Sequence, residues 1–226
     1  YDVGSYGPQD IQTQNNKFLG KIDWNINDKH QFTLRYNYID AFDDNLSRRA
    51  NFFRFGNNAY KFTNKQSSLV AELRSNFNSS FSNNLILGYS SIKDSRDTAG
   101  SPFPQITILN IGGVSGASAE FGSQRSSFAN ELDQTIFEVT DNFKWNIGKN
   151  TFTLGTHNEF FSFRNLFINN LNGRWDFNSV ADYLNNVPAR VRATYSLIPG
   201  EPRPEAKFSA AQLGFYAQGE SEVFKN

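Results

Sequence analysis

The sequence predicts an all-β protein: a transmembrane antiparallel up-and-down β-barrel, of which this chain supplies a fragment of about seven strands with long extracellular loops. Three observations lead to this prediction. Apolar residues recur with a period of two, short and long connections alternate, and aromatic rings make up 15% of the residues while charged residues make up only 19%. Rings pack well on a pleated sheet, and this alternation is typical of strands that separate an apolar face from a wet one.

The composition excludes several other classes of protein. Lys plus Arg and Asp plus Glu both number 22, so the chain lacks the basic balance of a nucleic-acid-binding domain. Cysteine is absent, which rules out disulfides, thiolate metal sites and thiol catalysis. The mean hydropathy is -0.56, and no apolar run approaches the roughly 18 residues of a membrane helix. Because the chain opens at Tyr1 without an initiating methionine, we expect a mature or excised segment of a longer protein.

The first predicted hairpin joins residues 18–26 to residues 31–38. Phe18, Ile22 and Trp24 alternate with polar residues in the first run, and the same pattern restarts after a short polar turn. Two alternating runs joined in this way predict an antiparallel pair.

Further runs with the same period follow the first hairpin. They predict a second pair, a third pair and a seventh strand that ends where another turn begins at Lys225. The runs are residues 67–77 with 84–95, residues 135–146 with 151–163, and residues 211–224.

Each predicted strand has one face expected to meet lipid and one expected to face a wet lumen or a plug. Asp141 interrupts the apolar face of the third pair, and Gly219 with Ser221 interrupts that of the seventh strand. Two tryptophans of the apolar set are expected at the membrane interface near the short turns. The lipid-facing set is Phe18, Ile22, Trp24, Phe32, Leu34, Tyr36, Leu69, Leu73, Phe137, Phe143 and Trp145. The lumenal set is Lys21, Asp23, Asn25, Arg35, Asn37, Glu72, Arg74, Glu138, Asn142 and Lys144.

The lengths of the connections predict the topology. Links within pairs span about four to seven residues, whereas residues 43–66, 96–130 and 165–210 form links of about 24, 35 and 45 residues. All short turns therefore lie at one end of the sheet and all long loops at the other, as in outer-membrane barrels. We expect each strand to pair antiparallel with its sequence neighbours only, with no parallel pair anywhere, and with turns centred near residues 28, 80 and 148.

Several segments together are similar to one known family. They are NKFLGKIDWNIN at residues 16–27, HQFTLRY at 30–36, NLILGYS at 84–90 with Arg96 and Phe103-Pro104 downstream, DFNSVADYL at 176–184, and QLGFYAQ at 212–218. These segments resemble the barrel of Oar-like TonB-dependent receptors of Bacteroidota. The chain departs from the family after residue 218, where Gly219-Glu220-Ser221 replaces the usual Asp-Glu-Trp or Asp-Glu-x-Trp.

The resemblance implies an outer-membrane barrel of about 22 strands with a plug domain inside it. It also implies energy from a periplasmic TonB-type coupler, acting through parts outside this chain. We expect residues 1–226 to be one segment of such a receptor barrel, in contact with outer-membrane lipid, lipopolysaccharide and an outer-membrane protein partner, and taking up a substrate that the sequence does not identify. The alternative is a transporter-like barrel that acts as a structural or assembly subunit of a larger outer-membrane complex. A soluble carbohydrate-binding β-sandwich is disfavoured, because its turns would recur about every 8 to 12 residues.

The long loops carry the candidate ligand-binding residues, because recognition falls to loops that a rigid scaffold positions. Rings and arginines contribute most at interfaces. The candidates are Arg48, Arg49, Phe52, Phe53, Arg54, Tyr60, Trp175 and Tyr183. An anionic or aromatic ligand would suit this mixture of charge and stacking. Alternatively, the same residues pack one loop on another, with the arginines reaching lipopolysaccharide or water.

No catalytic or cofactor motif is found, so we expect neither an enzyme nor a cofactor. His157 has no nominated nucleophile or orienting partner, and is expected to be a wall histidine beside water or a polar side chain. Asp40, Asp43 and Asp44 are candidates for calcium ligands, a solvated loop base being the alternative, and no metal site is predicted. The triplet Asp97-Thr98-Ala99 resembles an O-glycosylation acceptor of Bacteroidota.

Overall fold

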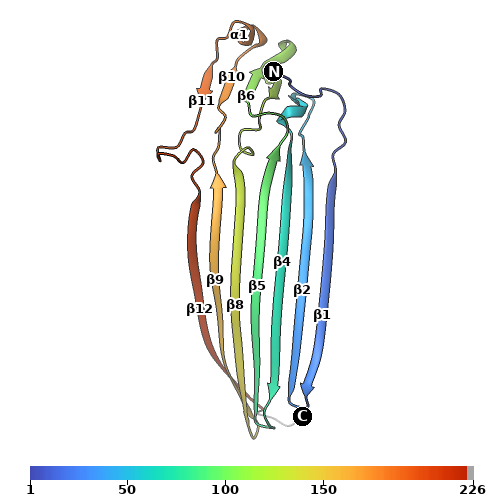
Figure 1. Ribbon diagram of the computed structural model, residues 1–226, viewed down its shortest axis with the longest axis vertical. Helices are drawn as coiled ribbons and strands as arrows, with labels where there is room; N and C mark the ends of the chain where they lie inside the picture. The colour runs from blue at the N-terminus through green and yellow to red at the C-terminus, as the bar shows by residue number, and fades with distance from the viewer. Residues whose placement is uncertain (223–226) are drawn as a thin grey trace.

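Seven long antiparallel strands form one curved sheet in the computed structural model, which describes residues 1–222 (Figure 1). The strand order is β1-β2-β4-β5-β8-β9-β12, so each strand pairs with the previous and the next long strand of the chain. The strands are β1 (Thr13–Asn27), β2 (His30–Asn45), β4 (Tyr60–Asn76), β5 (Phe81–Thr98), β8 (Asn130–Ile147), β9 (Asn150–Phe167) and β12 (Ala206–Ser221).

A second, smaller sheet lies at the end of the molecule opposite the hairpin turns (Figure 1). Its order is β11-β10-β6-β7-β3. Its elements and the short helices beside them are β3 (Phe52–Arg54), η1 (Gly56–Asn58), β6 (Gln105–Leu109), η2 (Ile111–Gly113), β7 (Ser118–Phe121), β10 (Arg174–Phe177), α1 (Val180–Leu184) and β11 (Arg190–Arg192).

The predicted meander and its three tight turns are confirmed. Asn27 accepts hydrogen bonds through its side-chain oxygen from the main-chain N–H groups of Lys29 and His30, at 2.9 and 3.0 Å. Asn78 does the same for the second hairpin. Gly148 takes a positive φ of 57° at the third. Asparagine side chains that accept from nearby main-chain N–H groups therefore close the first two turns, and a glycine in the left-handed conformation closes the third. The last residues of the predicted seventh strand and the turn at Lys225 lie outside the described residues.

The strands extend further toward the loops than the period of two predicts. β2 continues to Asn45 and β4 begins at Tyr60, where the prediction placed strand ends at residues 38 and 67. The other long strands that face a loop extend likewise, so the connections shorten to residues 46–59, 99–129 and 168–205. The prediction failed here because main-chain pairing needs no apolar side chains, and the regular alternation of apolar and polar residues is lost in these upper segments.

The exclusion of parallel pairs is wrong for the small sheet. β10 pairs parallel with β6, and β3 pairs parallel with β7. These strands come from different loops, and a long crossover lets two segments run in the same direction. Among the seven long strands every pair is antiparallel.

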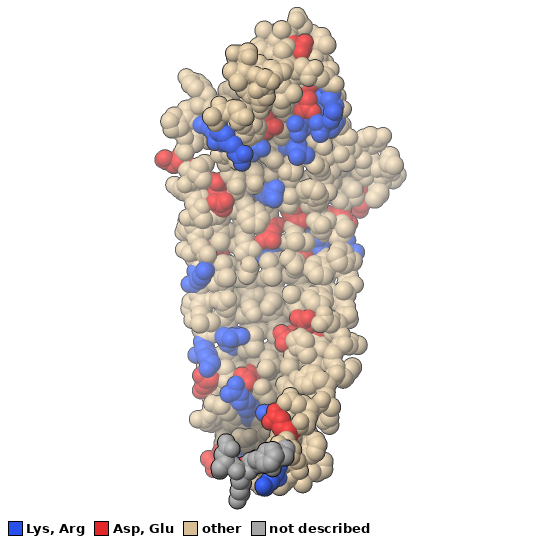
Figure 2. All heavy atoms as spheres, turned by 180° about the vertical axis from the view of Figure 1, so that it is seen from behind, with Lys and Arg blue, Asp and Glu red and all other residues tan. Residues whose placement is uncertain are grey.

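The in-register pairing sorts the side chains by polarity. Trp24 pairs with Phe32, which pairs with Leu73 on the next strand, so all three lie on one face. All eleven predicted lipid-facing residues share this apolar face, and all ten predicted lumenal residues share the other. No second sheet covers the apolar face within residues 1–222, and Trp24 is 59% exposed. Seen from behind, charged side chains are spread along the length of the long sheet and gather again near the loops (Figure 2).

The residues that interrupt the apolar face are accommodated locally. Asp141 accepts a 2.7 Å hydrogen bond from the side-chain amide of Asn83 on the neighbouring strand. Gly219 pairs with Phe152, whose ring lies over the glycine. A ring that covers a strand glycine replaces the packing that the missing side chain would have given.

The staggered hairpin ends indicate how far the strands tilt. Cross-strand partners form rows of residues that run across the sheet. One such row begins with His30 at the first turn and continues with Ser75, Asn83 and Phe143 on β8. The turn after β8 follows Ile147, about four residues further along the strand. Four strand spacings separate the first turn from the third, so with about 3.3 Å per residue and about 4.8 Å per strand this stagger corresponds to a tilt of roughly 35°. Strands of membrane barrels tilt by a similar angle.

Two neighbours on β5 test the assignment of faces. Leu87 lies on the apolar face and is 39% exposed, while Ile86 lies on the polar face. We expect Leu87→Lys in the complete protein to reduce folding stability in lipid vesicles by about 1–3 kcal/mol, because the charge would sit within the apolar band, between its middle and its loop-side edge. Ile86→Lys is the matched control and should cost under about 1 kcal/mol, since its charge meets water. Urea titration with heat-dependent gel mobility measures both, and a larger loss for Ile86→Lys would contradict the assignment.

Candidate functional site

The three long loops fold together into one body, called here the loop module: residues 46–59, 99–129 and 168–205 with the N-terminal residues 1–12. Its core is the buried cluster Ile106, Ile108, Phe121 and Phe177. Tyr183 of α1 packs edge-on against Phe121 and Phe177, with ring centroids 5.9 and 5.3 Å apart. The long sheet contributes little to any apolar core, so the loop module is the part of the chain that packs like a soluble domain.

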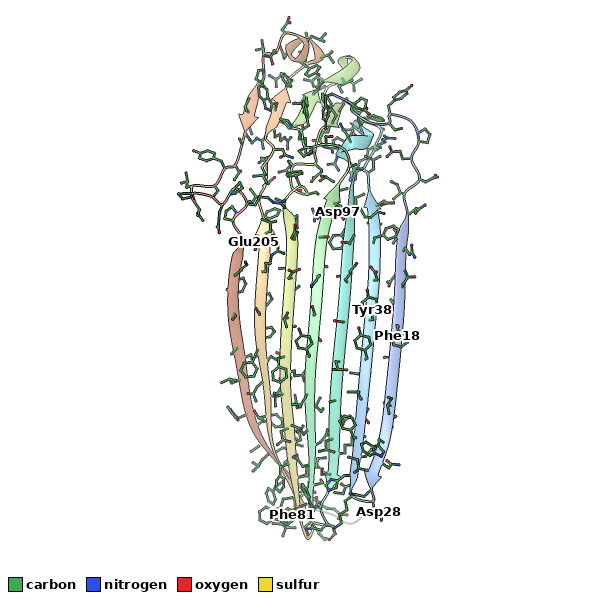
Figure 3. All side chains as sticks on the ribbon, in the orientation of Figure 1. Phe18, Asp28, Tyr38, Phe81, Asp97 and Glu205 are labelled. Atoms are coloured by element: carbon green, nitrogen blue, oxygen red, sulfur yellow. The ribbon has the colours of Figure 1, made fainter. Side chains whose placement is uncertain are left out.

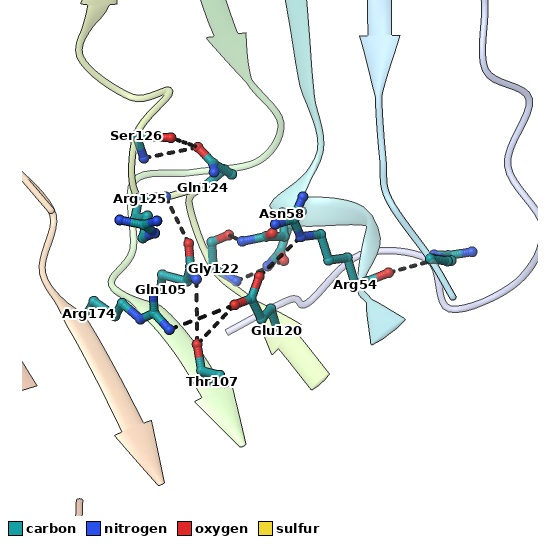
Figure 4. Close-up of polar contacts among 12 residues, drawn as sticks. Arg54, Asn58, Gln105, Thr107, Glu120, Gly122, Gln124, Arg125, Ser126 and Arg174 are labelled. Carbon is teal, nitrogen blue, oxygen red and sulfur yellow. Dashed lines mark hydrogen bonds and ion pairs between the residues drawn. The ribbon is translucent and has the colours of Figure 1, made fainter. Parts of the chain in front are cut away.

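Buried charges join the three loops to one another. The Glu120 side chain is only 8% exposed; its carboxylate lies 3.1 Å from Nε of Arg54 and 4.0 Å from Nη2 of Arg174 (Figure 4). Nε of Arg174 also lies 2.6 Å from Asp176, which is 2.5 Å from Nη2 of Arg192. Since Arg54, Glu120 and Arg174 come from three different loops, the network fixes how the loops sit on one another.

The two neighbouring arginines lower the pKa of Asp176. Burial alone raises the pKa of the Asp176 carboxyl, but the hydrogen bonds and charges of Arg174 and Arg192 outweigh burial, so that its pKa lies below the ordinary value of 3.8. The carboxylate is therefore charged and paired at neutral pH.

Buried amides and one glycine complete the base of the module. The Asn57 side-chain oxygen accepts from the main-chain N–H of Gly122, and the Asn58 side-chain amide donates to the Gly122 carbonyl, both at 2.9 Å. Gly122 has a φ of 86°, and a Cβ there would lie 2.1 Å from the carbonyl oxygen of Pro104. Only glycine fits this position.

The structure uses several predicted ligand-binding residues to hold the loops together. Arg48 donates hydrogen bonds to the carbonyl oxygens of Arg54, Gly7 and Ser5, and its guanidinium lies 4.5 Å from the centre of the Phe53 ring. Arg54 lies over Phe52 at 4.9 Å in addition to its pair with Glu120. These contacts correspond to the loop-packing alternative.

The other candidates lie in different parts of the module. Trp175 packs against the buried cluster, and the guanidinium of Arg96 lies 5.2 Å from the centre of the Tyr60 ring at the base of the loops. Arg49 is exposed, and Tyr183 is 37% exposed. The sequence did not single out Glu120, Arg174 or Gln105, which is 1% exposed and accepts a hydrogen bond from the main-chain N–H of Arg125. The only signal was that Gln105 and Glu120 are single polar residues between apolar neighbours, and Arg174 gave none.

The three predicted calcium candidates do not converge. Asp43 accepts hydrogen bonds from Thr13 and Asn45, and Asp44 lies 3.6 Å from Nζ of Lys61. Asp43 lies on the opposite face of β2 from Asp40 and Asp44. Within residues 1–222 no group of three or more His, Cys, Asp and Glu side chains is placed to hold a metal ion.

The polar face of the long sheet is hollowed and lined by ion pairs. A hollow of about 620 Å³ contains the pairs Lys21–Asp23 and Arg74–Glu72, both at 2.8 Å, together with Arg35. Further along this face, Nδ1 of His157 lies 2.7 Å from Oγ1 of Thr140 and 3.6 Å from Glu138. His157 is therefore a wall residue beside polar neighbours, where the sequence analysis placed it.

Aromatic rings frame the apolar face at both ends. Near the hairpin turns, the Phe81 and Trp145 rings stack with centroids 6.0 Å apart, and Phe152 lies 6.2 Å from Trp145. Toward the loops, Tyr36, Leu69, Tyr89, Phe137 and Phe160 form one row across five strands, called here the aromatic row. About eight residues separate the two levels, which gives roughly 22 Å along the barrel axis. This agrees with the height of about 25 Å of the apolar band of a membrane barrel.

The fold and its two aromatic levels agree with the comparison of the chain with known families. A family model described as an outer membrane beta barrel domain matches residues 4–224. The chain belongs to this family. It is thus an outer-membrane β-barrel protein of bacteria, as predicted, and its polar face lines the lumen.

The remaining comparisons add no relative. No curated protein and no solved structure matches the chain. No helix of residues 1–222 has the length and apolar character needed to cross a membrane.

The buried pairs predict how the module responds to loss of Arg174. Arg174→Ala leaves Glu120 and Asp176 with one arginine each, so we expect the module to open more easily, by about 2–3 kcal/mol. Limited proteolysis of the complete protein in detergent should then cut residues 99–129 and 168–205 about 30-fold faster or more. Arg190→Ala, at an exposed arginine of the same loop, is the matched control and should change little. Equal cleavage rates in the two variants would contradict the proposed importance of the network.

Acid should loosen the module through Asp176. Because the folded pKa of Asp176 is depressed, its contribution to stability is complete above the ordinary value of 3.8 and is lost as pH falls through the lower folded pKa. We expect protease resistance of the loops to persist from pH 7 to about pH 4 and to decline below it. In Asp176→Asn this acid step should shrink, which proteolysis with an acid-active protease at a series of pH values measures. An unchanged step would assign it to other carboxylates.

Proposed function

We propose that this chain forms part of the barrel of a TonB-dependent receptor, which takes up a substrate across the outer membrane by binding and translocation rather than catalysis. The observation that carries the proposal is the ordered loop module above a polar lumenal wall. Loops with their own core and buried charges present a surface whose shape is set before a ligand arrives, and a preorganised site loses less entropy on binding. The resemblance to Oar-like receptors of Bacteroidota supports the same function.

The lumenal wall is the second support for transport. Its charged residues alternate in sign along β1 and along β4, and its hollow of about 620 Å³ keeps Lys21, Asp23, Glu72 and Arg74 in pairs. Such a wall suits contact with a polar domain or a hydrated substrate inside the barrel. The TonB-type coupler would act through parts outside this chain.

Among the eight candidate ligand residues, we propose Arg49 and Tyr183 for ligand contact. Both are exposed on the module, whereas Arg48 and Arg54 bind other loop residues. An arginine and a phenol at the surface suit an anionic or aromatic ligand through charge, hydrogen bonding and stacking.

A structural role in a larger outer-membrane complex is the second candidate function. The observation that favours it is a group of exposed apolar side chains at and just after α1, farthest from the hairpin turns (Figures 1 and 3). Leu184 is 76% exposed, Val187 59% and Val180 43%. Apolar side chains gathered at the outer tip of a rigid module suit a lasting contact with a partner protein.

Two paired variants separate these functions. Arg49→Ala with Tyr183→Phe removes the proposed charge and phenol contacts while keeping the ring that packs against Phe121 and Phe177, and Leu184→Asp with Val187→Asp removes the apolar tip. In cells that carry each variant as the only copy, surface display, depletion of compounds from a defined nutrient medium and co-purification of outer-membrane proteins are measured.

For a receptor we expect normal display with depletion of at least one compound slowed about tenfold or more by the first pair, which corresponds to about 1.4 kcal/mol of lost binding. Loss of a co-purifying protein in the second pair, with unchanged depletion in both, would instead support the structural role. Arg190→Ala serves as the control, and wild-type behaviour in both pairs would contradict a role for the module in either function.

A further inference from the structure

The outer surface of the barrel changes character within a few residues above the aromatic row. From β4 to β12 the next row of the same face carries the hydroxyl residues Ser67, Ser91, Thr135, Ser162 and Ser209, while its β1 and β2 positions hold the rings of Phe18 and Tyr38; the row after that carries Asp40, Lys65, Lys93, Asp133, Arg164 and Lys207. Rings, hydroxyls and charges therefore follow one another toward the loops. This order is that of a membrane interface, where aromatic residues lie at the headgroup level and charged residues meet the headgroups.

Lys65 and Lys93 occupy an unusual place in the charged row. They are direct cross-strand partners on β4 and β5, and both are exposed. Like charges placed directly opposite one another destabilise a sheet unless a counterion lies between them.

The neighbouring carboxylates do not supply that counterion. Asp40 and Asp133 flank the two lysines in the row, but Asp133 lies 3.0 Å from Nη1 of Arg164. Within residues 1–222 no carboxylate oxygen lies within 4.0 Å of Lys65 or Lys93, whereas Lys207 of the same row lies 3.1 Å from Glu205.

The side chains above and below the lysines on the same two strands are all hydroxyls. Thr63 and Ser95 pair toward the loops, with their hydroxyl oxygens 2.7 Å apart, and Ser67 and Ser91 pair toward the aromatic row. Ammonium and hydroxyl groups are the donors that phosphate oxygens accept from. The six residues, called here the phosphate ladder, are Thr63, Lys65, Ser67, Ser91, Lys93 and Ser95.

We propose that the phosphate ladder binds a phosphate group of an outer-leaflet glycolipid of the lipopolysaccharide type. The ladder lies on the lipid-facing side of the barrel, toward the loops and two rows above Tyr89, where a lipid headgroup meets the wall. A phosphate between the two ammonium groups removes their repulsion and accepts from the hydroxyls beside them. This site goes beyond the proposed function, since it holds whether the barrel transports a substrate or supports a complex.

The test compares lipid retention by variants of the complete protein. Lys65→Gln/Lys93→Gln removes both charges of the ladder, and Lys21→Gln/Lys144→Gln removes the same charge from the lumenal face. Each protein is purified in detergent, checked for folding by heat-dependent gel mobility, and stripped of lipid. Binding of bis-phosphorylated lipid A, enzymatically dephosphorylated lipid A and inorganic phosphate is then measured by native mass spectrometry and by titration.

We expect wild type and the lumenal control to bind bis-phosphorylated lipid A equally, and the ladder variant to bind it about tenfold or more weakly. Lys65→Arg/Lys93→Arg should retain most of the binding, because the charge remains. Equal binding by wild type and the ladder variant would overturn the proposal, as would equal binding of dephosphorylated lipid A. If the ladder binds inorganic phosphate but not lipid A, its ligand is a free anion, and this result would overturn the proposal of a lipid ligand. If the ladder variant fails to fold, the single Lys93→Gln variant gives the same comparison.

Discussion

Main-chain hydrogen bonding between neighbouring strands is the interaction on which the rest of this structure depends. A bilayer offers no water to unpaired N–H and C=O groups, so a strand that crosses it must bond to strands on both sides. Here β2, β4, β5, β8 and β9 each have a partner on either side, with the register kept except at one irregularity between Asn25 and Asn27 of β1. The register determines which side chains lie next to one another across the sheet. It therefore sets both the stacked rings at the turns and the charged row below the loops.

The pairing also explains why the apolar core lies away from the barrel wall. A single sheet with lipid on one face and a wet lumen on the other has no interior of its own, and its apolar side chains are exposed, as Trp24 and Leu87 are. The loops have no lipid to cover them. They therefore bury their own apolar side chains in the cluster around Ile106 and Phe177, and their buried polar groups need partners within the protein.

Buried charge gives the loop module one arrangement in place of many. An apolar cluster of four residues tolerates several packings, but Glu120 between Arg54 and Arg174 has few positions in which its carboxylate is satisfied. Such networks contribute to specificity more than to net stability, because desolvation offsets much of their attraction. For a receptor or a complex subunit, a single loop arrangement matters because the outer surface then keeps its shape.

The sequence by itself determined the membrane fold, the two faces and the three turns. Period two is a local property of a strand, and residues such as Asn27 and Asn78 close turns through bonds within a few residues of themselves. The upper strand segments escaped prediction because pairing there continues without an apolar pattern.

Only the tertiary structure decided the parallel pairs, the arginine–carboxylate network and the phosphate ladder. Arg54, Glu120 and Arg174 come from three loops, and Lys65 meets Lys93 only because the β4–β5 turn sets that register. Contacts of this kind depend on how distant segments align, and that alignment cannot be predicted from a local pattern of residues.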